Sequence, residues 1–177
     1  MEEIEVKILE VPAEAVVARL EALGARQDTD EHMHALYFDS PDNALTRRKD
    51  SLRLRREGDR VLLNFKAHRP GADMKIKDEH ETTVGDLEAA RRILEGLGYT
   101  VWFETEKHRR GWVLDRLPGV HFVFDRFLGA HRQVPELLEI EAPTRALLVD
   151  AVTAAGYTMD QTVSWNGFEV VEHYRAQ

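Results

Sequence analysis

The chain has 177 residues, a formal net charge of −8 and no cysteine. This length suits one domain with a substantial core. The acidic balance argues against nonspecific nucleic-acid binding, because a domain that binds the phosphate backbone is normally basic. The lack of cysteine excludes disulfide frameworks, thiolate zinc sites and cysteine nucleophiles.

The amino-terminal segment carries no targeting or membrane signal. MEEIEVKILE is acidic and alternating, whereas a secretory signal has a basic start followed by an apolar run. No stretch approaches the roughly 18 apolar residues of a membrane span. We therefore expect a single cytoplasmic domain, residues 1–177, that contacts neither membrane nor nucleic acid.

The first half of the chain is predicted to contain mostly strands. Residues 3–9 alternate between charged and apolar side chains, which is the period of a strand with two different faces. A helix is predicted from Pro12 to Leu23, because its apolar residues recur at helical spacing. Further strands are expected at His32–Phe38, Ser51–Arg56, Val61–Ala67 and Ile76–Val84, with a hairpin turn at Glu57–Asp59.

The second half alternates between helices and strands. A second helix is predicted over Gly85–Leu97, before the terminating Gly98. The remaining elements are strands at Tyr99–Glu104, Gly111–Leu114, His121–Phe127 and Pro135–Glu141, a helix at Thr144–Ala155, and a helical or irregular segment at Thr162–Tyr174. Mostly antiparallel strands with a few covering helices indicate an α+β fold.

Charged side chains, with one neutral asparagine among them, recur two positions apart in these strands, so each set projects from one face. The sets are Glu3, Glu5 and Lys7; Arg53 and Arg55; Asn64 and Lys66; Lys77, Glu79 and Glu81; Lys107 and Arg109; and Glu139 with Glu141. For any one strand, a solvated sheet face explains this pattern. Its recurrence, with both signs of charge, favours a sheet closed into a polar barrel.

Such a charged interior has the composition for binding metal and phosphate together. Mg²⁺ prefers carboxylate and water oxygens and commonly bridges to substrate phosphates. Arginine offers a planar fork to phosphate oxygens and lysine a compact charge. Burying so many ions without partners would be prohibitive, so we expect acids and bases to alternate around the interior.

In their order along the chain, these segments resemble the CYTH family, also called triphosphate tunnel metalloenzymes. The family includes thiamine triphosphatases, inorganic triphosphatases and class IV adenylyl cyclases. Its ExExK signature stands here as Glu3, Glu5 and Lys7. The later matching segments are YFDSP at 37–41, SLRLR with Arg53 and Arg55, NFK with Lys66, KDEHE with Lys77, Glu79 and Glu81, EKHRRGW with Lys107 and Arg109, FVFD with Asp125, and LLEIEA with Glu139 and Glu141.

The resemblance implies a closed eight-stranded antiparallel β-barrel, a triphosphate tunnel, with covering helices. It implies catalytic roles for Glu3, Glu5 and Lys7, with Mg²⁺, or alternatively Mn²⁺, as cofactor. The implied metal residues are Glu3, Glu5, Glu79, Glu81, Asp125, Glu139 and Glu141. The implied phosphate-binding residues are Lys7, Arg53, Arg55, Lys66, Lys77, Lys107 and Arg109.

A metal-dependent triphosphatase acting on a small-molecule triphosphate, as a monomer or homodimer, is the function we expect. The same constellation fits an adenylyl cyclase that converts ATP to cyclic AMP and pyrophosphate, but the sequence shows no clear adenine-reading motif. A noncatalytic polyphosphate- or nucleotide-binding module is the remaining alternative. It could dispense with carboxylates such as Glu5 and Glu139, which this chain retains.

Overall fold

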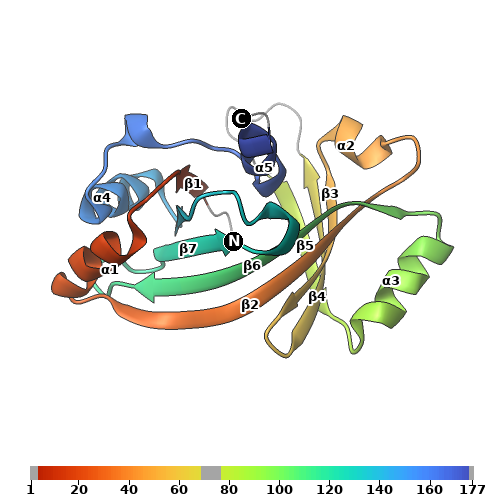
Figure 1. The fold of residues 1–177 in the computed structure, drawn as a ribbon, viewed down its shortest axis with the longest axis horizontal. Coiled ribbons are helices and arrows are strands. Elements are labelled where there is room, and N and C mark those ends of the chain that lie inside the picture. The colour runs from red at the N-terminus through yellow and green to blue at the C-terminus, as the bar shows by residue number, and fades with distance from the viewer. Residues whose placement is uncertain (1–3, 69–76, 176–177) are drawn as a thin grey trace. The chain divides into compact units, whose positions relative to one another are not determined.

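The computed structural model describes residues 4–68 and 77–175, and its fold is α+β (Figure 1). Within these residues one eight-stranded sheet has the order β1-β8-β7-β6-β2-β3-β4-β5. The strands are β1 (Ile4–Ile8), β2 (Arg26–Asp39), β3 (Ser51–Glu57), β4 (Arg60–His68), β5 (Lys77–Thr83), β6 (Thr100–Val113), β7 (His121–Phe127) and β8 (Leu137–Ala142). The α-helices are α1 (Ala13–Ala22), α2 (Ala44–Arg48), α3 (Leu87–Gly96), α4 (Arg145–Ala155) and α5 (Gly167–Arg175).

The sheet confirms the antiparallel arrangement predicted from the sequence. Antiparallel pairing joins β1 to β8, β8 to β7 and β7 to β6, and also β2 to β3, β3 to β4 and β4 to β5. The hydrogen-bonded order begins at β1 and ends at β5. Closure of the sheet into a barrel therefore stays a prediction.

Three elements differ from the sequence-based expectation. Strand β2 begins at Arg26, six residues before the expected start at His32, and the short helix α2 was not expected. The two strands expected at Tyr99–Glu104 and Gly111–Leu114 are one continuous strand, β6. The segment between them, residues 105–110, shows no strand alternation because it is polar on both faces. Its side chains nevertheless form ion pairs with residues of neighbouring strands.

The chain divides into two compact units. The first unit comprises residues 1–31 and 107–177, and the second comprises residues 32–106. Each has its own apolar core. The single domain expected from the sequence stays a prediction.

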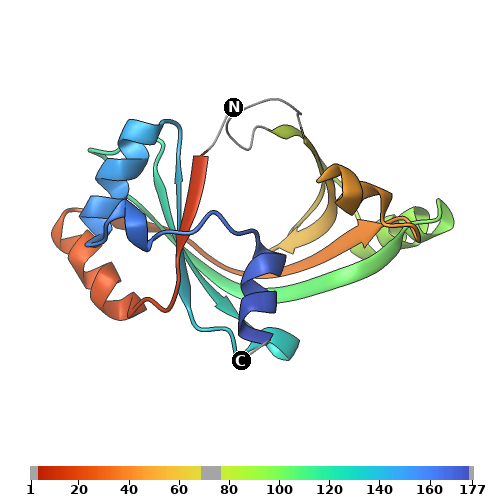
Figure 2. The ribbon, with the colours of Figure 1, turned by 90° about the horizontal axis from the view of Figure 1, so that it is seen from above.

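In the first unit, helices α1 and α4 cover the apolar face of the strands. The two helices lie side by side (Figure 2) and contact each other, and α4 also contacts β1 and β8. Val6, Phe124 and Ile140 bring the alternating apolar positions of β1, β7 and β8 into this core. Because strand side chains alternate between faces, the intervening charged positions project from the opposite face.

In the second unit, helix α3 covers the strands. Leu87 and Leu94 of α3 pack with Leu36 of β2, Leu54 of β3 and Val61 of β4. The Asp86 side chain caps the helix by accepting a hydrogen bond from the Ala89 backbone N–H. The charged positions of β3 and β4 again alternate with the buried ones.

Within the described ranges, each helix is too short or too polar to cross a membrane.

Candidate active site

Three carboxylates meet on the charged face of the first unit. Antiparallel pairing of β1 with β8 places Glu5 directly opposite Glu141 and Lys7 opposite Glu139. Oxygens of Glu5, Glu139 and Glu141 lie within 4.8 Å of one another. The alternation read from the sequence therefore does bring these residues together.

The Lys7 ammonium joins two of these carboxylates. It is 4% exposed and donates hydrogen bonds to Glu5 Oε1 and Glu139 Oε1, each at 3.2 Å. Burial opposes its charge, but the adjacent carboxylates of Glu139 and Glu5 dominate and raise the pKa of Lys7 above its ordinary value. Lys7 is therefore a permanent cation that neutralises part of the acidic cluster.

Asp125 of β7 is fully buried and held by two cations of β6. Arg109 makes a bidentate contact, with Nε donating to Oδ1 and Nη2 to Oδ2, both at 2.8 Å. Lys107 Nζ donates to Oδ2 at 2.8 Å and lies 4.5 Å from the ring centroid of Phe127. Burial would raise the pKa of Asp125, but Arg109 and Lys107 hold it well below its ordinary value.

Glu139 connects these groups into one network. It accepts from Lys7 on one oxygen and from Arg109 Nη2, at 3.2 Å, on the other. Burial opposes ionisation of Glu139, but Lys7 and Arg109 lower its pKa despite the nearby charge of Asp125. Acids and bases thus alternate, as expected for buried ions that must compensate one another.

The donor set of this cluster fits a divalent cation that prefers oxygen ligands. Glu139 is nearly buried, whereas the Glu5 side chain is 51% exposed and Glu141 is half-buried. Mg²⁺ usually takes one or two carboxylates and keeps several waters, which an oxygen cluster open on one side permits. The Asp125 carboxylate is already paired with Arg109 and Lys107. Glu3 lies outside the described residues.

A second charged cluster forms on strands β3, β4 and β5 of the second unit. Cross-strand pairing places Tyr37, Arg53, Asn64 and Glu81 in one row, each opposite the next. The neighbouring pair on β4 and β5 is Lys66 with Glu79. The sequence-predicted residues Arg53, Arg55, Lys66, Glu79 and Glu81 therefore share one face of three adjacent strands.

Ion pairs connect this second cluster. Lys66 Nζ lies 2.9 Å from Glu79 Oε2, and Arg55 Nη2 lies 2.9 Å from Glu57 Oε1 and 3.6 Å from Glu81 Oε2. Burial would raise the pKa of Glu79, but the hydrogen bonds and charges around it, Lys66 first, lower it. Lys77 is the first residue of β5, and its side chain lies outside the described part of the chain.

Sequence reasoning gave no role to three residues of this cluster. Glu57, expected in a hairpin turn, instead ends β3 and pairs with Arg55. Tyr37 lies 6.0 Å below the Arg53 guanidinium, measured to the ring centroid. Asn64 donates to Glu79 and Glu81. The period-two spacing placed Asn64 on the charged face. Because its side chain is neutral, the charge pattern gave no indication of a role for it.

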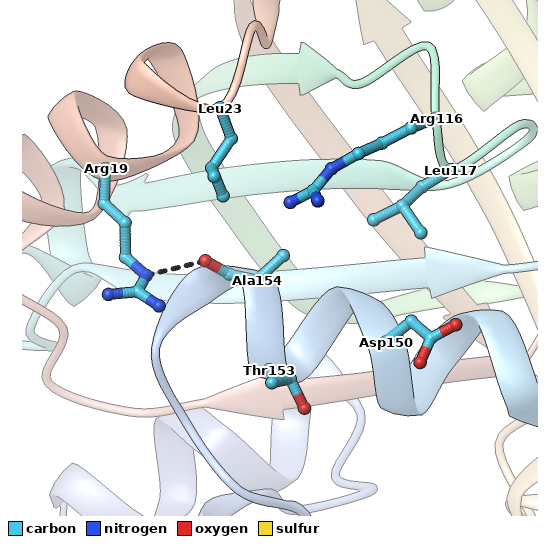
Figure 3. A pocket seen from close by; sticks show the side chains of 7 residues that line it. All are labelled: Arg19, Leu23, Arg116, Leu117, Asp150, Thr153 and Ala154. Carbon is cyan, nitrogen blue, oxygen red and sulfur yellow. Dashed lines mark hydrogen bonds between the residues drawn. The ribbon is translucent and has the colours of Figure 1, made fainter.

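A pocket of about 450 Å³ lies elsewhere in the first unit, between α1, α4 and the turn after β6 (Figure 3). Among the residues that the structure describes, no sequence-predicted site residue lines it. Arg19 extends to α4 there, and its Nε donates to the Ala154 carbonyl at 2.8 Å. The absence of a side chain at Gly156 makes room for Arg19, because a Cβ would lie 3.2 Å from Nε. Arg19 therefore joins two helices.

Comparison with known proteins identifies one family and several similar folds. The CYTH domain matches residues 1–154, whereas no curated protein matches the chain significantly. A Vibrio parahaemolyticus protein, provisionally described as an adenylate cyclase, is 19% identical with a TM-score of 0.78, over 96% of this chain and 97% of that one. A Pyrococcus horikoshii protein is 23% identical with a TM-score of 0.77, over 96% and 99% of the two chains.

A third similar structure comes from Hippeastrum. It is 17% identical with a TM-score of 0.68, over 97% of this chain and 96% of that one. It is provisionally described as an adenylyl cyclase that reveals a dominant triphosphatase activity. At these identities the three structures support the fold.

Proposed function

Because the chain belongs to the CYTH family, we propose that it is a divalent-metal-dependent triphosphatase. The carboxylates of Glu5, Glu139 and Glu141, whose oxygens lie within 4.8 Å of one another, carry this proposal. A noncatalytic phosphate-binding module would need cations but not such an oxygen cluster. Closure of the sheet into a barrel, a cytoplasmic location and a small triphosphate as substrate are parts of the same proposal.

The carboxylates of β1 and β8 would hold Mg²⁺ or Mn²⁺, with Glu3 as a further ligand. A bound divalent cation supplies charge neutralisation at phosphate oxygens and a water of lowered pKa. Lys7 and Arg109 each contact Glu139, so they fix the position of that carboxylate and keep it ionised. Arg109 and Lys107 hold Asp125 in the same way.

Cations on β3 and β4 are proposed to bind phosphates. Arg53 and Arg55 offer planar guanidinium groups and Lys66 a compact charge, which together can spread over the several negative charges of a triphosphate. Lys77 belongs to this proposed set through its place in β5. The chain then needs no covalent nucleophile, because positioning and charge stabilisation account for much of phosphoryl-transfer catalysis.

Adenylyl cyclase activity is the second candidate, favoured by the provisional description of the similar Vibrio structure. The dominant triphosphatase activity named for the Hippeastrum protein favours hydrolysis. Both reactions use a metal-bound triphosphate, but a cyclase must also orient the ribose hydroxyl. We therefore place hydrolysis first.

Product analysis with Mg²⁺ or Mn²⁺ tests the proposal, using inorganic triphosphate, thiamine triphosphate and ATP. We expect orthophosphate without cyclic AMP. Cyclic AMP with an equal amount of pyrophosphate would establish the cyclase instead. Binding of tripolyphosphate without any product would establish the noncatalytic module.

The double variant Glu5→Gln, Glu141→Gln tests the metal site directly. Turnover should fall by roughly 100-fold or more, a large effect for a change at a metal site. The fold should persist, because Lys7 keeps its contact with Glu139. The control is Glu95→Gln, at an exposed ion pair with Arg91 on α3. Equal turnover in the double variant and the control would refute the metal assignment.

A further inference from the structure

Asn64 is the central residue of the second charged cluster. It lies on β4, directly opposite Arg53 of β3 on one side and Glu81 of β5 on the other. It is only 1% exposed, although the carboxylates beside it reach solvent. A neutral polar side chain is therefore buried among ions at the middle strand.

The side-chain amide of Asn64 donates to two carboxylates at once. Nδ2 contacts Glu79 Oε1, and it lies 3.2 Å from Glu81 Oε2. Glu79 and Glu81 are two residues apart on the same face of β5, so their charges repel each other. An amide nitrogen has two hydrogens, and one hydrogen can serve each carboxylate.

The chemistry also fixes the orientation of the amide. Turning it over would place Oδ1 against two negatively charged groups, so Nδ2 must face β5. In this orientation Oδ1 is buried, and within the described part of the chain it accepts no hydrogen bond. A buried unsatisfied acceptor in a native structure needs an explanation. Here the two donor contacts of Nδ2 provide one.

Each of the two carboxylates also contacts a cation. Glu79 pairs with Lys66 at 2.9 Å, and Glu81 lies 3.6 Å from the guanidinium of Arg55. The contacts therefore run from Lys66 through Glu79, Asn64 and Glu81 to Arg55. A change at Asn64 would release both carboxylates and would therefore loosen Lys66 and the contact of Arg55 with Glu81, while Arg55 keeps its 2.9 Å contact with Glu57.

We propose that Asn64 is a positioning residue for phosphate binding, which holds Lys66 and Arg55 in place through its hydrogen bonds to Glu79 and Glu81. This inference rests on the proposed function, because it assumes that Lys66 and Arg55 bind phosphates. It adds Asn64 to the site. It also gives Glu79 and Glu81 a role of their own, which is to orient the cations. Asn64 itself need not touch the substrate.

Two β-branched substitutions of nearly equal shape provide the test. Asn64→Thr keeps one hydrogen-bond donor, whereas Asn64→Val keeps none, and both residues suit a strand. We expect the KM for tripolyphosphate, and its Kd measured by calorimetry, to rise about tenfold in Asn64→Val and about threefold in Asn64→Thr, on the scale of hydrogen bonds to charged groups. The kcat should change less than KM in both.

A loss of fold is separated from a loss of positioning by the control Asn166→Ala. Asn166 accepts a hydrogen bond from the Glu169 backbone at the start of α5, so its loss should lower the melting temperature and leave KM unchanged. Equal KM values in the Thr and Val variants would show that shape alone matters, and would overturn the inference. Wild-type protein that neither binds nor hydrolyses tripolyphosphate would overturn the proposed function as well.

Discussion

At the scale of single residues, Asp39 shows how one carboxylate organises a loop. It ends β2, is 1% exposed, and accepts backbone hydrogen bonds from Ser40, Leu45 and Thr46 at 2.8, 2.9 and 2.9 Å. The Thr46 hydroxyl donates to the same carboxylate at 2.6 Å. These four donors fold the chain back into the short helix α2.

The substitution Asp39→Asn should destabilise the protein by about 1–3 kcal/mol, the cost of leaving buried hydrogen-bonding groups unpaired. An asparagine amide would present N–H donors in place of one of the two carboxylate oxygens that now accept. Urea denaturation measures the difference. Asp42→Asn is the control, because Asp42 is exposed and should have a much smaller effect. Equal stabilities of the two variants would contradict this account.

The same residue predicts a dependence of stability on pH. Burial would raise the pKa of Asp39, but the hydrogen bonds led by Thr46 lower it below its ordinary value. A carboxyl with a depressed pKa in the folded state stabilises the protein fully above its unfolded pKa of about 3.9, and this contribution is lost as pH falls through the folded pKa. The stability difference between wild type and Asp39→Asn should therefore shrink below about pH 4.

At the scale of elements, the packing of β6 against β2 depends on a glycine. A Cβ at Gly111 would lie 2.8 Å from Asp28 Oδ1 and 2.9 Å from Thr29 Cβ. The Asp28 carboxylate can rotate away, but the Thr29 Cβ is fixed to its backbone. Gly111 thus permits close approach of β6 to the first part of β2.

Gly111→Ala should destabilise the protein by about 1–3 kcal/mol, the usual cost of overpacking. Thermal and urea denaturation both measure it. Gly96→Ala in α3 is the matched control, because a Cβ there meets no atom within 4 Å. Alanine also favours a helix over glycine by about 1 kcal/mol, so the control should be as stable as wild type or more stable. A Gly111→Ala variant more stable than wild type would show that β2 can shift to accommodate the Cβ without loss of stability.

The elements also show what the sequence could predict. The alternation in β1 and β8 correctly indicated that Glu5, Lys7, Glu139 and Glu141 share a face, because side-chain direction in a strand follows from spacing alone. Spacing does not reveal which cross-strand partners meet. The family resemblance implied that Lys7 and Arg109 are phosphate ligands, but neither the resemblance nor the spacing indicated that each contacts Glu139.

Elements that depend on tertiary partners were missed or misjudged. Helix α2 has five residues, too few to show a periodicity, and its first residues donate hydrogen bonds to the Asp39 carboxylate, which the local sequence does not reveal. The middle of β6 lacks an apolar alternation, because His108 pairs with Asp30 on one face while Arg109 pairs with Asp125 on the other. Burial and charge pairing decide both elements, and neither is local.

At the scale of the whole molecule, the two units raise the question of cooperativity. β2 and β6 have 14 residues each, and each strand contributes residues to both units. A unit that unfolded alone would have to release half of two long strands while the other halves stayed paired. The ladder hydrogen bonds and side-chain packing of a strand form together, so this partial unfolding is expected to be costly.

We therefore predict one unfolding transition, as expected of a single cooperative domain. Tryptophans report on the units separately, because Trp102 lies in the second unit beside Phe103, and Trp112 lies in the first beside Phe124. Variants that keep only Trp102 or only Trp112, with the other tryptophans changed to phenylalanine, should melt at temperatures that agree with calorimetry on the same variant. Two separated calorimetric transitions, each followed by one tryptophan, would instead establish two domains.

Coincident transitions would mean that a ligand bound to either charged cluster stabilises the whole chain, because any free energy of binding to the folded state adds to one shared equilibrium.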